Sequence, residues 1–211
     1  MIGWEEITAL LVFAFASTWT PGPNNFLLAN AGARFGFRRS IPHMLGMAVG
    51  FPFMVFCVAM GLGELFQTQA WFREGLRVIG AAALGWICWR IVFMPFPGDA
   101  PSQSQSYEVA VRPWRFWQAA AFQWINPKAW ALALGVSAAY VKGEALVYES
   151  LLCALPFVVS ASTSTPGWVL FGIIIRGFLN TRLRFRVYNL VIGSLMAVSG
   201  VLLFADLFVG E

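Results

Sequence analysis

Long, almost uninterrupted apolar stretches constrain this chain more than any other feature of its sequence. Cutting the sequence at its charged residues leaves six stretches of spanning length, at 7–31, 42–66, 76–94, 116–141, 151–175 and 187–209. A helix needs about 20 mostly apolar residues to cross the hydrocarbon core of a bilayer. The pattern therefore predicts an all-α integral membrane protein with six transmembrane helices.

The composition of the chain argues against an attached soluble domain. Of the 211 residues, 59% are hydrophobic and 11% are Asp, Glu, Lys or Arg, whereas about a quarter of an ordinary soluble domain is charged. Six spans leave little chain for a catalytic or nucleotide-hydrolysing domain, and no phosphate-binding loop motif precedes a helix. The sequence therefore predicts neither an enzyme nor a bound cofactor, and any pumping has to use an existing gradient.

A polar segment divides the chain into two halves of similar size. Residues 97–106 read Pro-Gly-Asp-Ala-Pro-Ser-Gln-Ser-Gln-Ser, a composition typical of a solvated loop. Three spans precede this segment and three follow it, so the second half enters the membrane with the opposite orientation. The odd number of spans in each half predicts an inverted repeat. Its parts are a first three-helix repeat at 1–96, a cytoplasmic linker at 97–113 and a second repeat at 114–211.

The basic residues predict the orientation, because Lys and Arg are retained on the cytoplasmic side of a membrane. Ten of the fourteen cations lie around the loops after spans one, three and five: Arg34, Arg38, Arg39, Arg90, Arg112, Arg115, Arg176, Arg182, Arg184 and Arg186. We expect these loops in the cytoplasm and both termini on the outer, periplasmic side of the inner membrane. The net charge of +4 is thus a topology signal, and no separate basic patch indicates nucleic-acid binding.

Two of the spans contain residues that interrupt a helix. The first contains Thr-Pro-Gly-Pro-Asn-Asn at 20–25, and the fourth contains Asn-Pro-Lys at 126–128. Proline removes a backbone donor and clashes with the preceding turn, so both helices are expected to break near the middle of the bilayer. Broken helices at corresponding positions of two repeats indicate the central site of a transporter. We predict a substrate-binding site formed by Pro21, Gly22, Pro23, Asn24, Asn25, Asn126, Pro127 and Lys128.

Lys128 lies inside the fourth predicted span, away from the loops that hold the other basic residues. An ammonium near the bilayer centre costs at least about 2.5 kcal/mol, so Lys128 needs a partner. That partner is either a substrate carboxylate or a carbonyl freed at Pro21 or Pro127, in which case Lys128 only closes a helix break. The asparagines are expected to bond the polar groups of the substrate, and Lys128 or the amino end of a half-helix is expected to bind its carboxylate.

Three other polar or small-residue features allow more than one interpretation. His43, at the inner mouth of the second span, is expected to be a hydrated anchor, with proton binding as the alternative. The Ser- and Thr-rich residues 160–165, before Pro166, either line the pathway or bond backbone carbonyls. Gly46 and Gly50 have the GxxxG spacing of close helix packing, within the chain or in a homodimer.

Four groups of residues also carry a resemblance to a known family. They are residues 20–25, Gly36 to Gly50 with Arg38, residues 80–82 with Trp86 and Arg90, and residues 126–128. Together they resemble the LysE/RhtB family of amino-acid exporters, within the LysE superfamily. The resemblance implies a compact six-helix exporter of the inner membrane, driven by the proton-motive force, although no carboxylate lies near the predicted midplane. Residues 20–25 also resemble the subgroup that exports cysteine and O-acetylserine.

Two other functions are weighed against amino-acid export. A metal-ion exporter of the same architecture would need a cluster of thiolate, imidazole or carboxylate ligands, and none is visible. A membrane thiol oxidoreductase would need paired cysteines, but Cys57, Cys88 and Cys153 stand apart from the helix breaks. The expected partners are therefore a small amino-acid substrate and the lipid bilayer.

Overall fold

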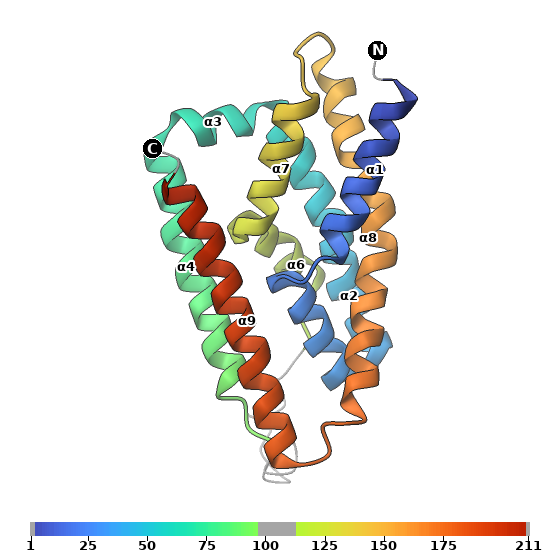
Figure 1. Ribbon diagram of the computed structural model, residues 1–211, viewed down its shortest axis with the longest axis vertical. Helices are drawn as coiled ribbons and strands as arrows, with labels where there is room; N and C mark the ends of the chain where they lie inside the picture. Colours follow the sequence, from blue (N-terminus) through green and yellow to red (C-terminus); the bar gives the residue numbers. More distant parts are fainter. Residues whose placement is uncertain (1–2, 97–112, 210–211) are drawn as a thin grey trace.

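A computed structural model describes residues 3–96 and 113–209, and every regular element in this part of the chain is helical (Figure 1). In chain order the elements are α1 (Trp4–Trp19), α2 (Pro23–Cys57), the π-helical turn η1 (Val58–Leu62), α3 (Gly63–Thr68), α4 (Ala70–Val92), α6 (Phe116–Phe122), the 3-10 turn η3 (Gln123–Ile125), α7 (Pro127–Tyr140), α8 (Leu146–Arg176) and α9 (Arg182–Val209). The all-α prediction is confirmed for these residues. Most of the predicted linker, 97–112 with Arg112, lies outside them.

Four helical segments of the described chain are long and apolar enough to cross a membrane: Pro23–Thr68, Ala70–Val92, Leu146–Arg176 and Arg182–Leu202. They contain most of the predicted spans at 42–66, 76–94, 151–175 and 187–209. The predicted span at 7–31 is interrupted between α1 and α2 by Pro21, Gly22 and Pro23, and the predicted span at 116–141 is interrupted before α7 by Pro127. The prediction of six transmembrane helices is therefore met only in part, and the six-helix repeat stays a prediction.

The helix α2 is bent at Gly36 into two arms. Gly36 has φ of 73° and ψ of −179°, a conformation that glycine adopts without a steric penalty. A straight helix of the 46 residues in Pro23–Thr68 would be about 70 Å long, more than twice the ~30 Å hydrocarbon core. The two arms correspond to parts of the first and second predicted spans, and the change of direction between them is made at a single glycine.

Helices from the two predicted halves of the chain pack on one another. The helix α8 lies along α2 and α1, and α9 lies along α4 (Figure 1). Glycine allows the backbones of α2 and α8 to approach closely: a Cβ at Gly32 would overlap the Val169 carbonyl, and a Cβ at Gly172 would overlap the Ala29 carbonyl. The two halves therefore form one interlocked bundle.

The predicted GxxxG pair of the second span packs inside the chain. A Cβ at Gly46 would overlap the Phe116 carbonyl, and a Cβ at Gly50 would lie 2.7 Å from the Cα of Ala120. Both contacts are made to α6. These two glycines thus serve packing between α2 and α6, and they give no support to the predicted homodimer.

Large apolar side chains are exposed along the outer faces of the long helices. Those on α8 and α9 include Leu151, Leu155, Val159, Leu170, Phe171, Ile174, Leu183, Leu190, Val191 and Leu195. An apolar surface of this extent is unfavourable in water and suits contact with lipid chains. The predicted lipid partner therefore has a matching surface.

The long helices begin and end at two opposite ends of the bundle. In Figure 1, α1 begins and α9 ends at the upper end, whereas α4 ends and α8 connects to α9 at the lower end. Arg90 and Arg176 lie in the last turns of α4 and α8, so they belong to the same end, as the distribution of basic residues predicts. The cytoplasmic location of that end stays a prediction.

Glu149 fixes the connection between α7 and α8. Its buried carboxylate accepts hydrogen bonds from the backbone N–H groups of Lys142 (2.8 Å), Gly143 (2.9 Å) and Ala145 (3.4 Å). We expect Glu149→Ala to lower the melting temperature in detergent, because three backbone donors of the connection lose their common acceptor. Glu144→Ala, at an exposed position of the same connection, is the control. Equal melting temperatures for the two variants would contradict this role.

Candidate functional site

The first helix break separates α1 from α2. Thr20 N donates to Ala16 O at the end of α1, and Gly22 is the extended N-cap of α2. The side chain of Asn25 spans the break, because its Nδ2 donates to Thr18 O and Thr20 O at 2.8 Å each. The predicted break is present, and the protein itself satisfies carbonyls that the break exposes.

The second break lies at Asn126, between η3 and α7. Asn126 Oδ1 accepts from Lys128 N at 3.1 Å, and Asn126 O accepts from Ala129 N and Trp130 N at 3.0 and 3.2 Å. Pro127 occupies the first helical position, where its missing N–H removes no helical hydrogen bond. The donors at the amino end of α7 are therefore already used by Asn126.

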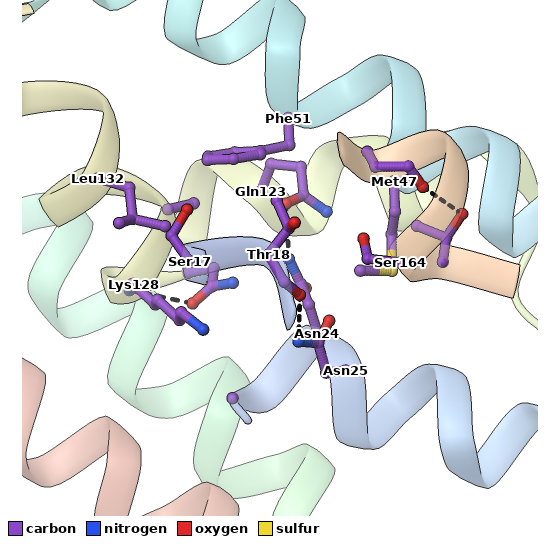
Figure 2. Close-up of a pocket in the computed structure, with 15 residues that line it drawn as sticks. Ser17, Thr18, Asn24, Asn25, Met47, Phe51, Gln123, Lys128, Leu132 and Ser164 are labelled. Carbon is purple, nitrogen blue, oxygen red and sulfur yellow. Dashed lines mark hydrogen bonds between the residues drawn. The ribbon is translucent and has the colours of Figure 1, made fainter. Parts of the chain in front are cut away.

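The two breaks face each other in the interior of the bundle (Figure 2). Lys128 Nζ donates to Thr20 O at 2.7 Å and so connects α7 to the carboxyl end of α1. Asn24 Nδ2 donates to Gln123 Oε1 at 2.7 Å, and Gln123 Nε2 donates to Ala119 O at 2.8 Å. Residues from the two predicted broken spans are thus joined directly, although about a hundred residues separate them in sequence.

A small polar cavity lies between the breaks, and we call it the central cavity. Its volume is about 50 Å³, and it is lined by Ser17, Thr18, Gly22, Asn24, Asn25, Met47, Phe51, Gln123, Asn126, Lys128, Ala129, Leu132, Ala161, Ser164 and Thr165. At ~10–15 Å³ for each water centre, it has room for about four waters.

Five of the eight predicted site residues line the central cavity: Gly22, Asn24, Asn25, Asn126 and Lys128. The prolines Pro21, Pro23 and Pro127 shape the breaks instead. The side chains of Asn25 and Asn126 bond the backbone, whereas the Oδ1 of Asn24 is buried with no hydrogen-bond partner among the described residues. Asn24 therefore offers the cavity an unused acceptor.

Three polar lining residues escaped the sequence prediction. Gln123 is fully buried, and its signal was an amide in an apolar run, three residues before Asn126. Ser17 and Thr18 lie one turn before the first break, and their hydroxyls donate to Ala14 O at 3.1 and 2.9 Å. Serine and threonine hydroxyls commonly bond carbonyls of their own helix in this way, so the sequence alone does not indicate that these two residues also line a cavity.

The helix α8 forms a further wall of the cavity and does not break at Pro166. Ser164 and Thr165 line the cavity, and Thr165 Oγ1 also donates to Ala161 O at 2.9 Å. Bonding to backbone carbonyls is thus present, two residues of the segment also line the cavity, and a pathway along them stays a prediction.

A larger cavity of about 550 Å³ adjoins the first arm of α2, and we call it the arginine vestibule. It is lined by Leu27, Asn30, Ala31, Arg34, Phe35, His43, Trp86, Ile87, Arg90, Ile91, Met94, Pro113, Trp114, Arg115 and Gln118. Leu27, Ala31 and Arg34 follow Asn24 by successive turns on one face of α2, so the vestibule begins one turn from the central cavity. Leu27 and Phe122 belong to one packed apolar cluster.

His43 lies in the wall of the arginine vestibule. It is 2% exposed, its ring stacks on Trp114 with centroids 5.3 Å apart, and neither ring nitrogen has a hydrogen-bond partner in the described chain. The expectation of a hydrated anchor is wrong, because the segment before α6 covers this part of α2.

The described residues contain no group of three His, Cys, Asp or Glu side chains that could hold a metal ion. Cys57, Cys88 and Cys153 are free thiols on α2, α4 and α8. Neither the metal-ion exporter nor the thiol oxidoreductase gains a supporting observation from this part of the chain.

Comparison with known proteins agrees with the resemblance found in the sequence. The family model described as LysE type translocator matches residues 15–207. The chain is 33% identical over 123 residues to a cysteine/O-acetylserine efflux protein of Klebsiella pneumoniae subsp. pneumoniae, and 30% and 28% identical to those of Salmonella paratyphi A and Escherichia coli K12. Each match spans 58% of this chain and 58% of the relative. No solved structure matches.

Proposed function

Because the chain belongs to the family of LysE type translocators, and so is a transporter and not an enzyme, we propose that it exports amino acids or closely related metabolites across the inner membrane. The relatives are named for efflux of cysteine and O-acetylserine, which makes small neutral amino acids the first candidates. The observation that carries the proposal is the pair of helix breaks that face each other around a polar cavity.

The carboxylate of the substrate binds at the amino end of α2. The first helical hydrogen bond there runs from Phe26 N to Gly22 O. The backbone N–H groups of Asn24 and Asn25 precede it, so they have no carbonyl acceptor within the helix. No side chain of the described residues caps this end. Unpaired amides and the positive end of a helix dipole bind anions, whereas the amino end of α7 is already capped by Asn126.

The ammonium of the substrate binds on the other side of the first break. The carboxyl end of α1 carries partial negative charge, and its Thr20 carbonyl already accepts a bond from an ammonium, that of Lys128. The unused Oδ1 of Asn24 is a second acceptor. A zwitterion with its ammonium toward α1 and its carboxylate toward α2 would satisfy both ends of the break, and amino acids share this charge pattern.

Transport proceeds by alternating access between the repeats 1–96 and 114–211. Corresponding elements of these repeats are neighbours: the two breaks meet at the central cavity, α2 packs on α8, and α4 packs on α9. This pairing supports an inverted repeat with the site on its axis. The arginine vestibule faces the cytoplasm, and separation of Leu27 from Phe122 would join it to the central cavity. The proton-motive force drives the cycle in the direction that exports the substrate.

Feeding cells a panel of dipeptides tests the proposal. Cells that overproduce the protein should release one or a few amino acids several times faster than cells with the Pro21→Ala, Lys128→Ala double variant at equal membrane levels. The panel includes peptides of cysteine and serine, and Lys142→Ala, at an exposed position between α7 and α8, is the matched control. An unchanged release of every amino acid would overturn export as the function.

A further inference from the structure

The ammonium of Lys128 occupies a defined position at the first helix break. Its Nζ is 2.7 Å from Thr20 O, at the carboxyl end of α1, where a helix dipole favours a cation. Its side chain crosses Gly22 so closely that a Cβ there would lie 2.9 Å from Cδ and 3.3 Å from Nζ of Lys128. A larger residue at position 22 would push this side chain aside, so the glycine leaves the path of the lysine open.

Among the described residues that line the central cavity, only Lys128 has an ionisable side chain. The other polar lining residues are neutral hydroxyls and amides: Ser17 and Thr18 from α1, Asn24 and Asn25 from α2, Gln123 from η3, Asn126 before α7, and Ser164 and Thr165 from α8. No lining carboxylate therefore offsets a second positive charge in this cavity.

A second ammonium at the same acceptors would meet strong repulsion. Two bare unit charges about 4 Å apart, at the effective dielectric constant of roughly 20 found near protein surfaces, repel by enough to change an affinity about a thousandfold, and the substrate's own carboxylate at the amino end of α2 offsets part of this repulsion. The protonated Lys128 and the ammonium of a substrate therefore exclude each other from the position at Thr20.

We infer that Lys128 is the proton-carrying group of the exchange, and that the substrate's ammonium displaces it; this inference rests on the proposed function. On the cytoplasmic side, substrate binding makes the Lys128 ammonium give one proton to water and leave Thr20 O as a neutral amine. On the outer side, the substrate departs, the amine takes one proton from water and returns to Thr20 O. Each cycle moves one substrate out and one proton in.

Proton release on substrate binding distinguishes this inference from the carboxylate-binding role of Lys128. A lysine that pairs with the substrate carboxylate has to keep its proton, so binding would release none. A displaced lysine releases up to one proton for each substrate bound, and substrate affinity then rises about tenfold for each pH unit while Lys128 is protonated in the free protein.

The experiment adds O-acetyl-L-serine and L-serine to the full-length protein in detergent, in weak buffer with a pH indicator, and measures binding separately by thermal shift. We expect the parent and Lys142→Met to release about one proton per substrate. Lys128→Met should release none and should bind more tightly in mild acid, with an affinity that does not vary with pH. Lys128→Arg, whose guanidinium keeps its proton, should bind at least tenfold more weakly and release none.

The outcomes separate this inference from the proposed function. Binding by the parent without proton release, or release by Lys128→Met equal to that of the parent, would overturn the role of Lys128 and leave export untouched. Failure of the parent both to bind these probes and to export any amino acid of the dipeptide panel would overturn the function itself. If Lys128→Met does not fold, proton release by the parent and substrate affinity of Lys128→Arg decide whether the inference holds.

Discussion

Gly172→Leu is expected to leave almost no folded protein. Gly172 lies in α8 against the carbonyl of Ala29, and even a Cβ at this position would overlap that carbonyl. A backbone group cannot move aside as a flexible side chain can, so α2 and α8 have to separate along the most extensive helix contact of the bundle. Overpacking of this kind costs about 3 kcal/mol or more, a large part of the stability of a typical domain.

The measurement is the yield and melting temperature of a fluorescent fusion in size-exclusion chromatography. Gly172→Ala should already lower the melting temperature, and Gly172→Leu should move the protein into the aggregate peak. Gly85→Leu is the matched control, because a Cβ at Gly85 in α4 meets no atom within 4 Å and the position is exposed. A monodisperse Gly172→Leu protein with the parent's melting temperature would show that α2 and α8 do not pack as described.

The sequence predicted the long helices and the helix breaks because both depend on local chemistry. Apolar runs of sufficient length lie in α2, α4, α8 and α9. Proline interrupts the first and fourth spans, in the first together with Gly22, wherever their neighbours lie. The turn between the first two spans was predicted as a loop at Arg34, Arg38 and Arg39. The chain there stays helical on both sides of Gly36 instead, because one glycine is enough to change its direction.

The partners of the site residues could not be predicted, because they come from distant parts of the chain. The bond between Asn24 and Gln123 joins residues 99 positions apart, and the bond from Lys128 to Thr20 joins residues 108 apart. Sequence spacing gives no information on such pairs. The same limit applies to Gly32 and Gly172, whose importance depends on the helix that crosses them.

Asn24→Leu and Asn25→Leu are expected to fail in different ways, although the two residues are adjacent in one motif. Asn25 holds the carbonyls of Thr18 and Thr20 with its Nδ2. Thr20 O also accepts a bond from Lys128, so Asn25→Leu removes the side-chain donor of Thr18 O alone, at a cost of about 1–3 kcal/mol. We expect a clear fall in melting temperature and in membrane level, and export reduced in proportion to the amount of folded protein.

Asn24→Leu should export poorly per folded molecule, beyond the stability it loses by leaving the buried Gln123 Oε1 without its donor. It removes the unused Oδ1 acceptor and one bond to Gln123, and a hydrogen bond to a charged group is worth about 1.5–3 kcal/mol, or about 10- to 100-fold in transport. Export per folded molecule, measured in proteoliposomes beside the melting temperature, separates the two variants. Adjacent helix positions point about 100° apart, so one amide faces the carboxyl end of α1 while its neighbour faces the cavity. If Asn24→Leu exported normally and Asn25→Leu were fully stable but inactive, the assignment of the two amides would have to be exchanged.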